Sequence, residues 1–329
     1  MRVVVAPDKF KGSLTAREVA ARVAAGIGAE APGVEVVQVP VADGGDGTLD
    51  AAVAAGFTRV QVRAQGPTGE PVTTAFAARD GVAVVEMADV SGLALLMPDR
   101  LDALGASSYG TGEVIRAALD HGCREIVLGI GGSASTDGGA GMVAALGARL
   151  YDADGGSLAP GGAALAGLHR LDLSGLHPAL AETRVVVASD VDNPLLGPNG
   201  AAAVYGPQKG ASEADVAALD RALARWADVV EAGVAGGGPS ASEQGAPAAT
   251  GSQEGAPAAT TGATLRDQPG AGAAGGVGFG AMAVLGAEMA SGIGLVLDLV
   301  GFGEHLPGAA LVVTGEGSLD AQTLSGKGP

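Results

Sequence analysis

The hydrophobic positions of this chain follow two alternating patterns, short continuous apolar runs and longer stretches with helical spacing. Continuous runs such as VVVA at 3–6 are typical of buried parallel strands. Residues 14–27 have helical spacing, and Thr15 and Glu18 stand at the spacing of a capping box. The patterns predict strands at 3–6, 34–39, 124–130, 183–189, 294–300 and 309–315, and helices at 14–27, 49–56, 112–122, 139–147 and 212–233. This alternation predicts an α/β fold with parallel strands.

Two segments depart from this alternation. Residues 59–87 alternate apolar and polar positions between turn signals, which predicts antiparallel hairpins and a second domain that opens near residues 65–70. Residues 234–268 contain the sequence GAPAAT twice and are rich in Gly, Ala, Pro, Ser and Thr. Such a composition has too few large apolar side chains to offset the entropy of ordering, so we expect a disordered insertion there.

The charge and composition of the chain exclude several classes of partner. Its formal net charge is -17 and its isoelectric point is near 4.5, which argues against nucleic acid or an anionic membrane as a partner. No apolar run approaches the length of a membrane span, and no signal segment is visible. The single cysteine, Cys123, fits a reducing compartment, so we expect a cytoplasmic protein.

Lysine is rare in this chain and is confined to loops. Lys9, Lys11, Lys209 and Lys327 are its four lysines, and each lies close to glycine in the sequence. The composition suggests a GC-rich coding sequence, in which a lysine without a special role tends to become arginine. Lysine is a compact point charge suited to phosphate, whereas arginine is a planar fork. These four lysines are therefore candidates for binding phosphate.

The loop after the predicted strand at 124–130 is the strongest candidate for an anion-binding loop. It contains Gly132, Ser133, Ser135, Thr136 and Asp137 and precedes a predicted helix. Glycines allow close approach to an anion, whose charge the helix dipole favours, and hydroxyl groups add donors. Asp137 is suited either to a metal ion or to capping the helix.

Acidic residues gather in loops at the ends of several predicted strands. They are Asp43 and Asp46, Asp190 and Asp192 with Asn193 beside them, and Glu316 and Asp320. Carboxylates in such loops suit Mg²⁺, which usually takes one or two of them together with substrate phosphates. A carboxylate there can also accept a hydroxyl proton during phosphoryl transfer. Asp190 stands out because it follows a fully apolar strand directly.

Two other functions remain open on these residues alone. Residues 129–134 fit the pattern G-x-G-x-x-A, and Asp152 lies at about the distance of a ribose-binding acid, which suits a nicotinamide-dependent oxidoreductase of a small hydroxy acid. A non-catalytic organic-acid sensor explains the anion loops but not the carboxylates beside them. The four histidines have no metal-ligand spacing, and a Walker A sequence is absent.

Several segments together resemble the bacterial glycerate kinase family of the type that lacks a P-loop. They are APDKFKGSLTA, VADGGDGT, GIGGSASTDGGAGM, SDVDNPLLGPNGAA, YGPQKGA, PGAGAAGG and VTGEGSLDAQTLSGK. The resemblance implies a Rossmann-like parallel-sheet domain plus a second mixed α/β domain, with the active site in the cleft between them. It also implies ATP-dependent phosphorylation of D-glycerate with Mg²⁺. Since the family continues past SGK, we expect this chain to be truncated at its C-terminus.

The resemblance and the loops together give a set of expected domains and site residues. We expect residues 1–68 and 286–329 in the Rossmann-like domain and residues 69–285 in the second. The candidate catalytic residues are Asp190, Lys11 and Lys9, and the candidate metal ligands are Asp137 and Asp190. The candidate residues for binding substrate or phosphate are Asp43, Asp46, Gly132, Ser133, Ser135, Thr136, Asn193, Lys209, Glu316, Asp320 and Lys327. The sequence leaves open whether the 2- or the 3-hydroxyl is phosphorylated.

Overall fold

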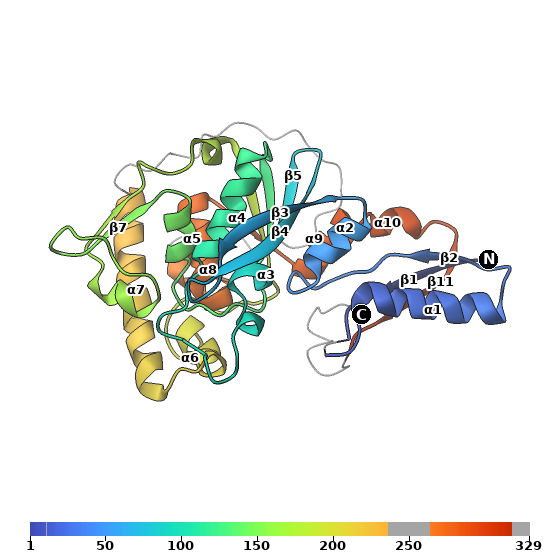
Figure 1. The fold of residues 1–329 in the computed structure, drawn as a ribbon, viewed down its shortest axis with the longest axis horizontal. Helices are drawn as coiled ribbons and strands as arrows, with labels where there is room; N and C mark the ends of the chain where they lie inside the picture. Colours follow the sequence, from blue (N-terminus) through green and yellow to red (C-terminus); the bar gives the residue numbers. More distant parts are fainter. Residues whose placement is uncertain (11, 236–263, 318–329) are drawn as a thin grey trace.

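The computed structural model describes residues 1–10, 12–235 and 264–317, and these form a larger and a smaller lobe (Figure 1). The strands are β1 Arg2–Pro7, β2 Glu35–Gln38, β3 Thr58–Gln65, β4 Pro71–Arg79, β5 Val82–Glu86, β6 Glu125–Gly129, β7 Arg149–Tyr151, β8 Arg170–Asp172, β9 Arg184–Ala188, β10 Glu288–Ala290 and β11 Ala309–Gly315. The helices are α1 Ala16–Glu30, α2 Thr48–Ala54, α3 Ala88–Ser91, α4 Tyr109–Asp120, α5 Ala140–Ala145, α6 Ala201–Tyr205, α7 Glu213–Ala235, α8 Ala273–Leu285, α9 Gly292–Leu299 and α10 Phe302–His305. The predicted α/β class is confirmed.

The smaller lobe contains a three-stranded parallel sheet in the order β11-β1-β2. Its central strand, β1, is almost entirely buried, as a continuous apolar run predicts. The capping box at the start of α1 is also confirmed, because the Thr15 hydroxyl accepts from the Glu18 amide and the Glu18 carboxylate accepts from the Thr15 amide. Val3, Val5 and Ala20 join this helix to the sheet.

The larger lobe is built on a six-stranded sheet in the order β10-β9-β6-β5-β4-β3. Strands β10, β9, β6 and β5 are parallel, whereas β4 pairs antiparallel with both β3 and β5. The hairpins predicted at 59–87 are therefore confirmed. The largest group of buried apolar side chains in the described residues includes Phe76, Ile126 and Trp226, and it joins one face of this sheet to helices that include α4, α7 and α8.

Helices α2 and α9 lie between the two sheets (Figure 1). In α9, Val296 packs with Val4 on the side of the three-stranded sheet, and Leu295 and Leu299 pack with Val84 on the side of the six-stranded sheet. The prediction of a strand at 294–300 was therefore wrong. The segment is apolar because both sides of this helix are covered, and a short apolar run does not distinguish a buried strand from such a helix.

The strands of the two larger sheets can be compared with the predicted division into domains. The three-stranded sheet does take strands from both ends of the described chain. However, β3 and β10 belong to the six-stranded sheet, although the ranges expected for the first domain, 1–68 and 286–329, contain them. We propose the two-domain division with its first boundary before Thr58.

The predicted disordered insertion lies outside the described residues at 236–263, whereas Leu265–Asp267 form a 3-10 helix. There the Arg266 guanidinium lies 2.6 Å from the Glu231 carboxylate of α7.

Candidate functional site

The loop at residues 43–47 brings the two lobes into direct contact. It follows β2, leads into α2, and lies against the ends of β6 and β9 in the larger lobe. A Cβ atom built on Gly131 would lie 2.8 Å from the Cα atom of Gly45, and one built on Gly44 would lie 2.9 Å from the Cβ atom of Ala188. Glycine is therefore needed for this close approach. The polar loops of both sheets converge at this contact.

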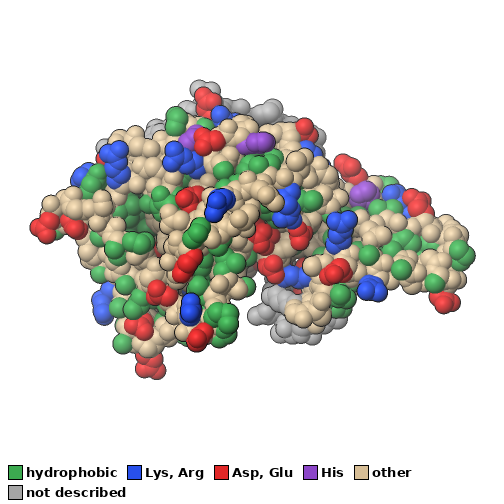
Figure 2. Space-filling model, in the orientation of Figure 1, with side chains coloured by type: hydrophobic (Ala, Val, Ile, Leu, Met, Phe, Trp, Pro, Cys, Tyr) green, Lys and Arg blue, Asp and Glu red, His purple; other side chains and the backbone are tan. Residues whose placement is uncertain are grey.

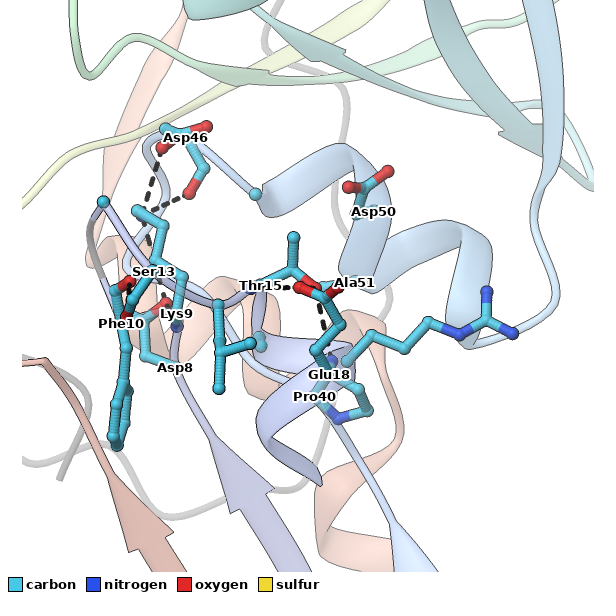
Figure 3. Close-up of a pocket in the computed structure, with 15 residues that line it drawn as sticks. Asp8, Lys9, Phe10, Ser13, Thr15, Glu18, Pro40, Asp46, Asp50 and Ala51 are labelled. Atoms are coloured by element: carbon cyan, nitrogen blue, oxygen red, sulfur yellow. Dashed lines mark hydrogen bonds and ion pairs between the residues drawn. The ribbon is translucent and has the colours of Figure 1, made fainter. Parts of the chain in front are cut away.

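A cavity of about 370 Å³ opens on the smaller-lobe side of this loop and contains the predicted lysine Lys9 (Figure 3). The Lys9 ammonium donates a hydrogen bond to the backbone carbonyl of Asp46. It also lies 3.9 Å from the carboxylates of Asp46 and Asp8. The structure thus brings together two of the predicted residues, Lys9 and Asp46, at the rim of a cavity large enough for a small charged group.

Asp8 belongs to this group and was missed by the sequence analysis. Its side chain is buried, and its carboxylate accepts a hydrogen bond of 2.6 Å from the backbone amide of Lys9. Burial raises the pKa of Asp8; Lys9 opposes this, while Asp43 and Glu316 add to the rise. Asp8, Asp43 and Glu316 therefore share one region of negative charge. The sequence did contain a signal for Asp8, because it lies just after the predicted strand at 3–6. Acids after other predicted strands were singled out for the same reason.

Glu86 is a second acidic residue that the sequence analysis missed. It ends β5 in the larger lobe, and its side chain is only 3% exposed. One of its carboxylate oxygens accepts from the backbone amide of Gly47 and the other from that of Leu49, both at 3.0 Å. Burial raises the pKa of Glu86 to about 8, and Asp89 and Asp46 add to the rise. A single acid at the end of an apolar strand was the signal for it.

The junction between the lobes is acidic beyond these residues. Burial raises the pKa of Asp89, and Asp50 adds to that rise. Asp50 is itself paired with Arg59. Figure 2 shows acidic side chains gathered between the two lobes on the face that it presents. A cation held at this junction therefore interacts with several carboxylates.

A second cavity, of about 290 Å³, opens on the larger-lobe side of the loop at 43–47. Among its lining residues are Gly132, Ser133, Ser189 and Tyr205, with Lys209 beneath them. The Lys209 ammonium donates to the Ser133 hydroxyl at 2.9 Å and to the backbone carbonyl of Ser135. Because its side chain is buried, the pKa of Lys209 is lowered to about 7, although Asp137 opposes the change. Lys209 thus supports the predicted anion-binding loop from behind.

The remaining residues of that loop are buried. The hydroxyls of Ser135 and Thr136 are fully buried and have no hydrogen-bond partner in the part of the chain that the structure describes. Asp137 is 1% exposed, and its carboxylate accepts from two serines and from the backbone amides of two glycines. These donors are Ser107 Oγ, Ser108 N and Oγ, Gly139 N and Gly141 N. These contacts tie the loop to the start of α4 and do not favour a metal ion at Asp137.

The loop after β9 places the other predicted residues at the same edge of the sheet. Asp190 is exposed, and its carboxylate accepts from the first amide of α9, that of Gly292, at 2.9 Å. Asn193 donates to the carbonyl of Asn199 at 2.8 Å and accepts from the Tyr205 hydroxyl at 2.6 Å. Asp190 is therefore available to solvent, whereas the side chain of Asn193 is held by its own loop.

Some predicted residues cannot be placed with these groups. Lys11, Asp320 and Lys327 lie outside the described residues. Among residues 1–10, 12–235 and 264–317, no group of three or more acidic, histidine or cysteine side chains is arranged to hold a metal ion. Since Mg²⁺ usually needs only one or two protein carboxylates, Asp8, Asp43 and Glu316 still fit it chemically. Within the same ranges, no helix is long and apolar enough to cross a membrane.

The residues that suggested a dinucleotide fingerprint have other roles in the structure. Asp152 lies just after β7, where its carboxylate accepts from the amides of Asp154 and Gly156. The second glycine-rich segment, 270–275, packs on the loop of Asp137, with the Gly138 amide donating to the carbonyl of Gly275 at 3.0 Å. Neither arrangement is that of a ribose or pyrophosphate site.

The fold and the site define an α/β protein in which charged, glycine-rich loops at the ends of its two larger sheets meet at one junction. Residues 3–329 match the model of the glycerate kinase family. The chain is 44% identical over 333 residues to the glycerate 2-kinase of Escherichia coli K12 and 43% identical over 332 residues to the glycerate kinase of Bacillus subtilis 168; both alignments cover 100% of this chain and 80% of the relative. It therefore belongs to the glycerate kinase family.

A solved structure supports the same assignment at the level of the fold. A crystal structure from Salmonella typhimurium LT2, described as a candidate glycerate kinase 2, matches 98% of this chain and 80% of its own with a TM-score of 0.84 and 41% identity. The predicted family and the predicted class of enzyme, a kinase acting on a small molecule, are thus confirmed. The family favours a kinase over the oxidoreductase and the sensor.

Proposed function

We propose that this protein is an ATP-dependent, Mg²⁺-dependent kinase that converts D-glycerate into phosphoglycerate, with ADP as the second product. The observation that carries the proposal is the position of Lys9, whose ammonium faces a cavity beside Asp8 and Asp46 in a chain of this family. A lysine ammonium among carboxylates suits the phosphates of a nucleotide when Mg²⁺ accompanies them. The net charge of -17 and the single cysteine support a cytoplasmic enzyme without a nucleic-acid partner.

The two substrates would occupy different cavities, one on each side of the loop at 43–47. The phosphates of ATP lie on the side of Lys9, and Asp43 and Glu316 are the residues that would hold Mg²⁺ there. Bound Mg²⁺ would neutralise negative charge that develops on the phosphoryl group. Glycerate lies on the side of Ser133 and Ser189, where the backbone of a glycine-rich loop approaches it.

In the reaction, a glycerate hydroxyl oxygen attacks the γ-phosphorus atom, and the bond from that phosphorus to the bridging oxygen of ADP breaks. The hydroxyl proton passes to a carboxylate, for which we propose Asp190, because it is exposed at the end of β9 and is oriented by the Gly292 amide. Lys9 stabilises negative charge on the transferred group. We assign Asp137 to holding the loop in place, since five donors already occupy its carboxylate.

The E. coli relative is named a glycerate 2-kinase, so we propose the 2-hydroxyl as the acceptor in this protein as well. The test incubates the protein with ATP, Mg²⁺ and D-glycerate, follows ADP, and identifies the product by phosphorus NMR against authentic 2- and 3-phosphoglycerate. ADP formation that depends on glycerate, with 2-phosphoglycerate as the product, is the expected result. ADP release without glycerate, or no release in a folded sample, would refute the proposed activity, and 3-phosphoglycerate would refute the choice of hydroxyl.

A further inference from the structure

The peptide group that joins Asp46 to Gly47 is held at both ends by hydrogen bonds to polar side chains from different lobes. Its carbonyl oxygen accepts from the Lys9 ammonium of the smaller lobe. Its N–H donates to Oε1 of Glu86 from the larger lobe at 3.0 Å. A peptide group is planar and rigid, so fixing its N–H also fixes the direction of its carbonyl. The orientation of this carbonyl in turn fixes where the Lys9 ammonium lies.

We propose that Glu86 is a positioning residue, which sets the place of the Lys9 ammonium in the active site through the Asp46–Gly47 peptide group. This inference rests on the proposed role of Lys9 in binding the phosphates of ATP. Among the described residues that line the two cavities, Glu86 is absent, and both of its hydrogen bonds come from backbone amides, those of Gly47 and Leu49. Its effect on the reaction therefore passes through Lys9.

The carboxylate of Glu86 takes the place of a side-chain cap at the start of α2. Helix α2 begins after Gly47, which has no side chain to cap it, so the amides of Gly47 and Leu49 depend on an acceptor from elsewhere. Glu86 reaches them from the end of β5, where it stands opposite Gly129 of β6. The strand that anchors Glu86 thus also borders the glycine-rich loop after β6. The sheet that positions Lys9 through Glu86 is therefore the same sheet that carries the proposed glycerate site.

Glutamine at position 86 tests the inference because it keeps the size of the side chain and removes one acceptor. Its amide nitrogen must then face one of two backbone N–H donors. We expect Glu86→Gln to lower kcat/KM for ATP by about 10- to 100-fold, since a small misplacement of a binding group is enough for such a loss. We expect the same division between kcat and KM as in Lys9→Ala.

A double variant separates positioning from a general loss of structure. Lys9→Ala combined with Glu86→Gln should be no slower than Lys9→Ala alone, because the effect of Glu86 is carried by Lys9. The matched control is Glu113→Gln, which alters a carboxylate of α4 that accepts the Gln65 amide at 2.7 Å. This control should leave the kinetics unchanged in both backgrounds. If Glu86→Gln slows the Lys9→Ala protein by the same factor as the unaltered protein, the inference is wrong.

One further measurement tests the inference independently of the reaction. The amide proton resonance of Gly47 reports its hydrogen bond to Glu86, so it should move in Glu86→Gln and also in Lys9→Ala without any substrate. A resonance that does not move in Lys9→Ala overturns the inference. If Glu86→Gln does not fold, Glu86→Asp, which keeps the carboxylate but shortens its reach, is put through the same cycle. A fully active Lys9→Ala protein refutes the proposed role of Lys9, whereas additive effects of two impaired variants refute only the positioning by Glu86.

Discussion

Replacing the buried Lys209 by methionine should change how the stability of the protein depends on pH. Lys209 is 1% exposed, and burial lowers its pKa to about 7 from an ordinary value of 10.5. In the unfolded chain the ammonium keeps its proton up to the ordinary value. Between about pH 7 and that value, the unfolded state therefore binds more protons than the folded state, so the free energy of unfolding rises with pH.

The size of the effect follows from the number of protons that are released. One proton difference gives ~1.4 kcal/mol per pH unit, so this lysine should add on the order of 1–3 kcal/mol to the stability between pH 7 and 9. Below about pH 7 both states hold the proton, and the contribution no longer changes with pH. Lys209→Met removes this slope. It also removes the hydrogen bonds to Ser133 and Ser135, which costs about 1–3 kcal/mol at every pH.

The measurement is urea unfolding of both proteins at several values between pH 6 and 9. The difference in free energy of unfolding cancels the titration of groups that the two proteins share. The control is Arg225→Met on α7, which removes a cation whose Nε donates to the Leu168 carbonyl at 2.6 Å. Since a guanidinium stays charged throughout this range, the free energies of unfolding of Arg225→Met and of the unaltered protein should differ by the same amount at every pH. If the difference in free energy of unfolding between Lys209→Met and the unaltered protein is also independent of pH, the reasoning is wrong.

Three other predictions test the loops and the first helix. Asp190→Asn should lower kcat by about 10²–10⁴-fold if Asp190 accepts the substrate proton, with little change in melting temperature; unchanged kcat in a folded protein excludes that role. Gly138→Ala should destabilise more than Gly155→Ala in urea unfolding, because both have positive φ angles but only the first would place a Cβ atom 2.5 Å from Trp226; equal losses would contradict this. Thr15→Ala should lower the free energy of unfolding by ~1 kcal/mol through loss of the helix cap, and no loss would show that α1 does not depend on it.

The sequence was sufficient for those elements whose environment is uniform along their length. The run at 3–6 is buried on both faces of β1, and the region 59–87 alternates because β3 and β4 form an antiparallel ribbon. The apolar pattern did not predict α9 as a helix, because its burial depends on two sheets whose strands are far apart in the sequence. When two opposite sides of a short helix are apolar, the apolar positions no longer mark a single face, and the helical period is hard to read from the sequence.

For the candidate site, the sequence located the loops but not the contacts that organise them. Lys9 and Asp46 were predicted separately, and nothing in their spacing shows that one donates to the other's backbone carbonyl. Glu86 was missed because it acts from a strand on the backbone of another lobe. Asp137 shows the opposite case, because the carboxylate that was a candidate metal ligand accepts from Ser108, which caps α4, and from the Gly141 amide of α5.

The two lysines that the structure describes share a role that explains why lysine stands there. Lys9 donates to the carbonyl of Asp46, and Lys209 donates to the carbonyl of Ser135, so each ammonium ends at the backbone of a glycine-rich loop. The space at Lys209 is narrow, since even a Cβ atom built on Gly275 would lie 2.9 Å from its nitrogen. A guanidinium is broader and would displace that backbone. A single compact cation thus holds the backbone of each loop, and the proposed role of Lys9 adds the binding of phosphate to this structural role.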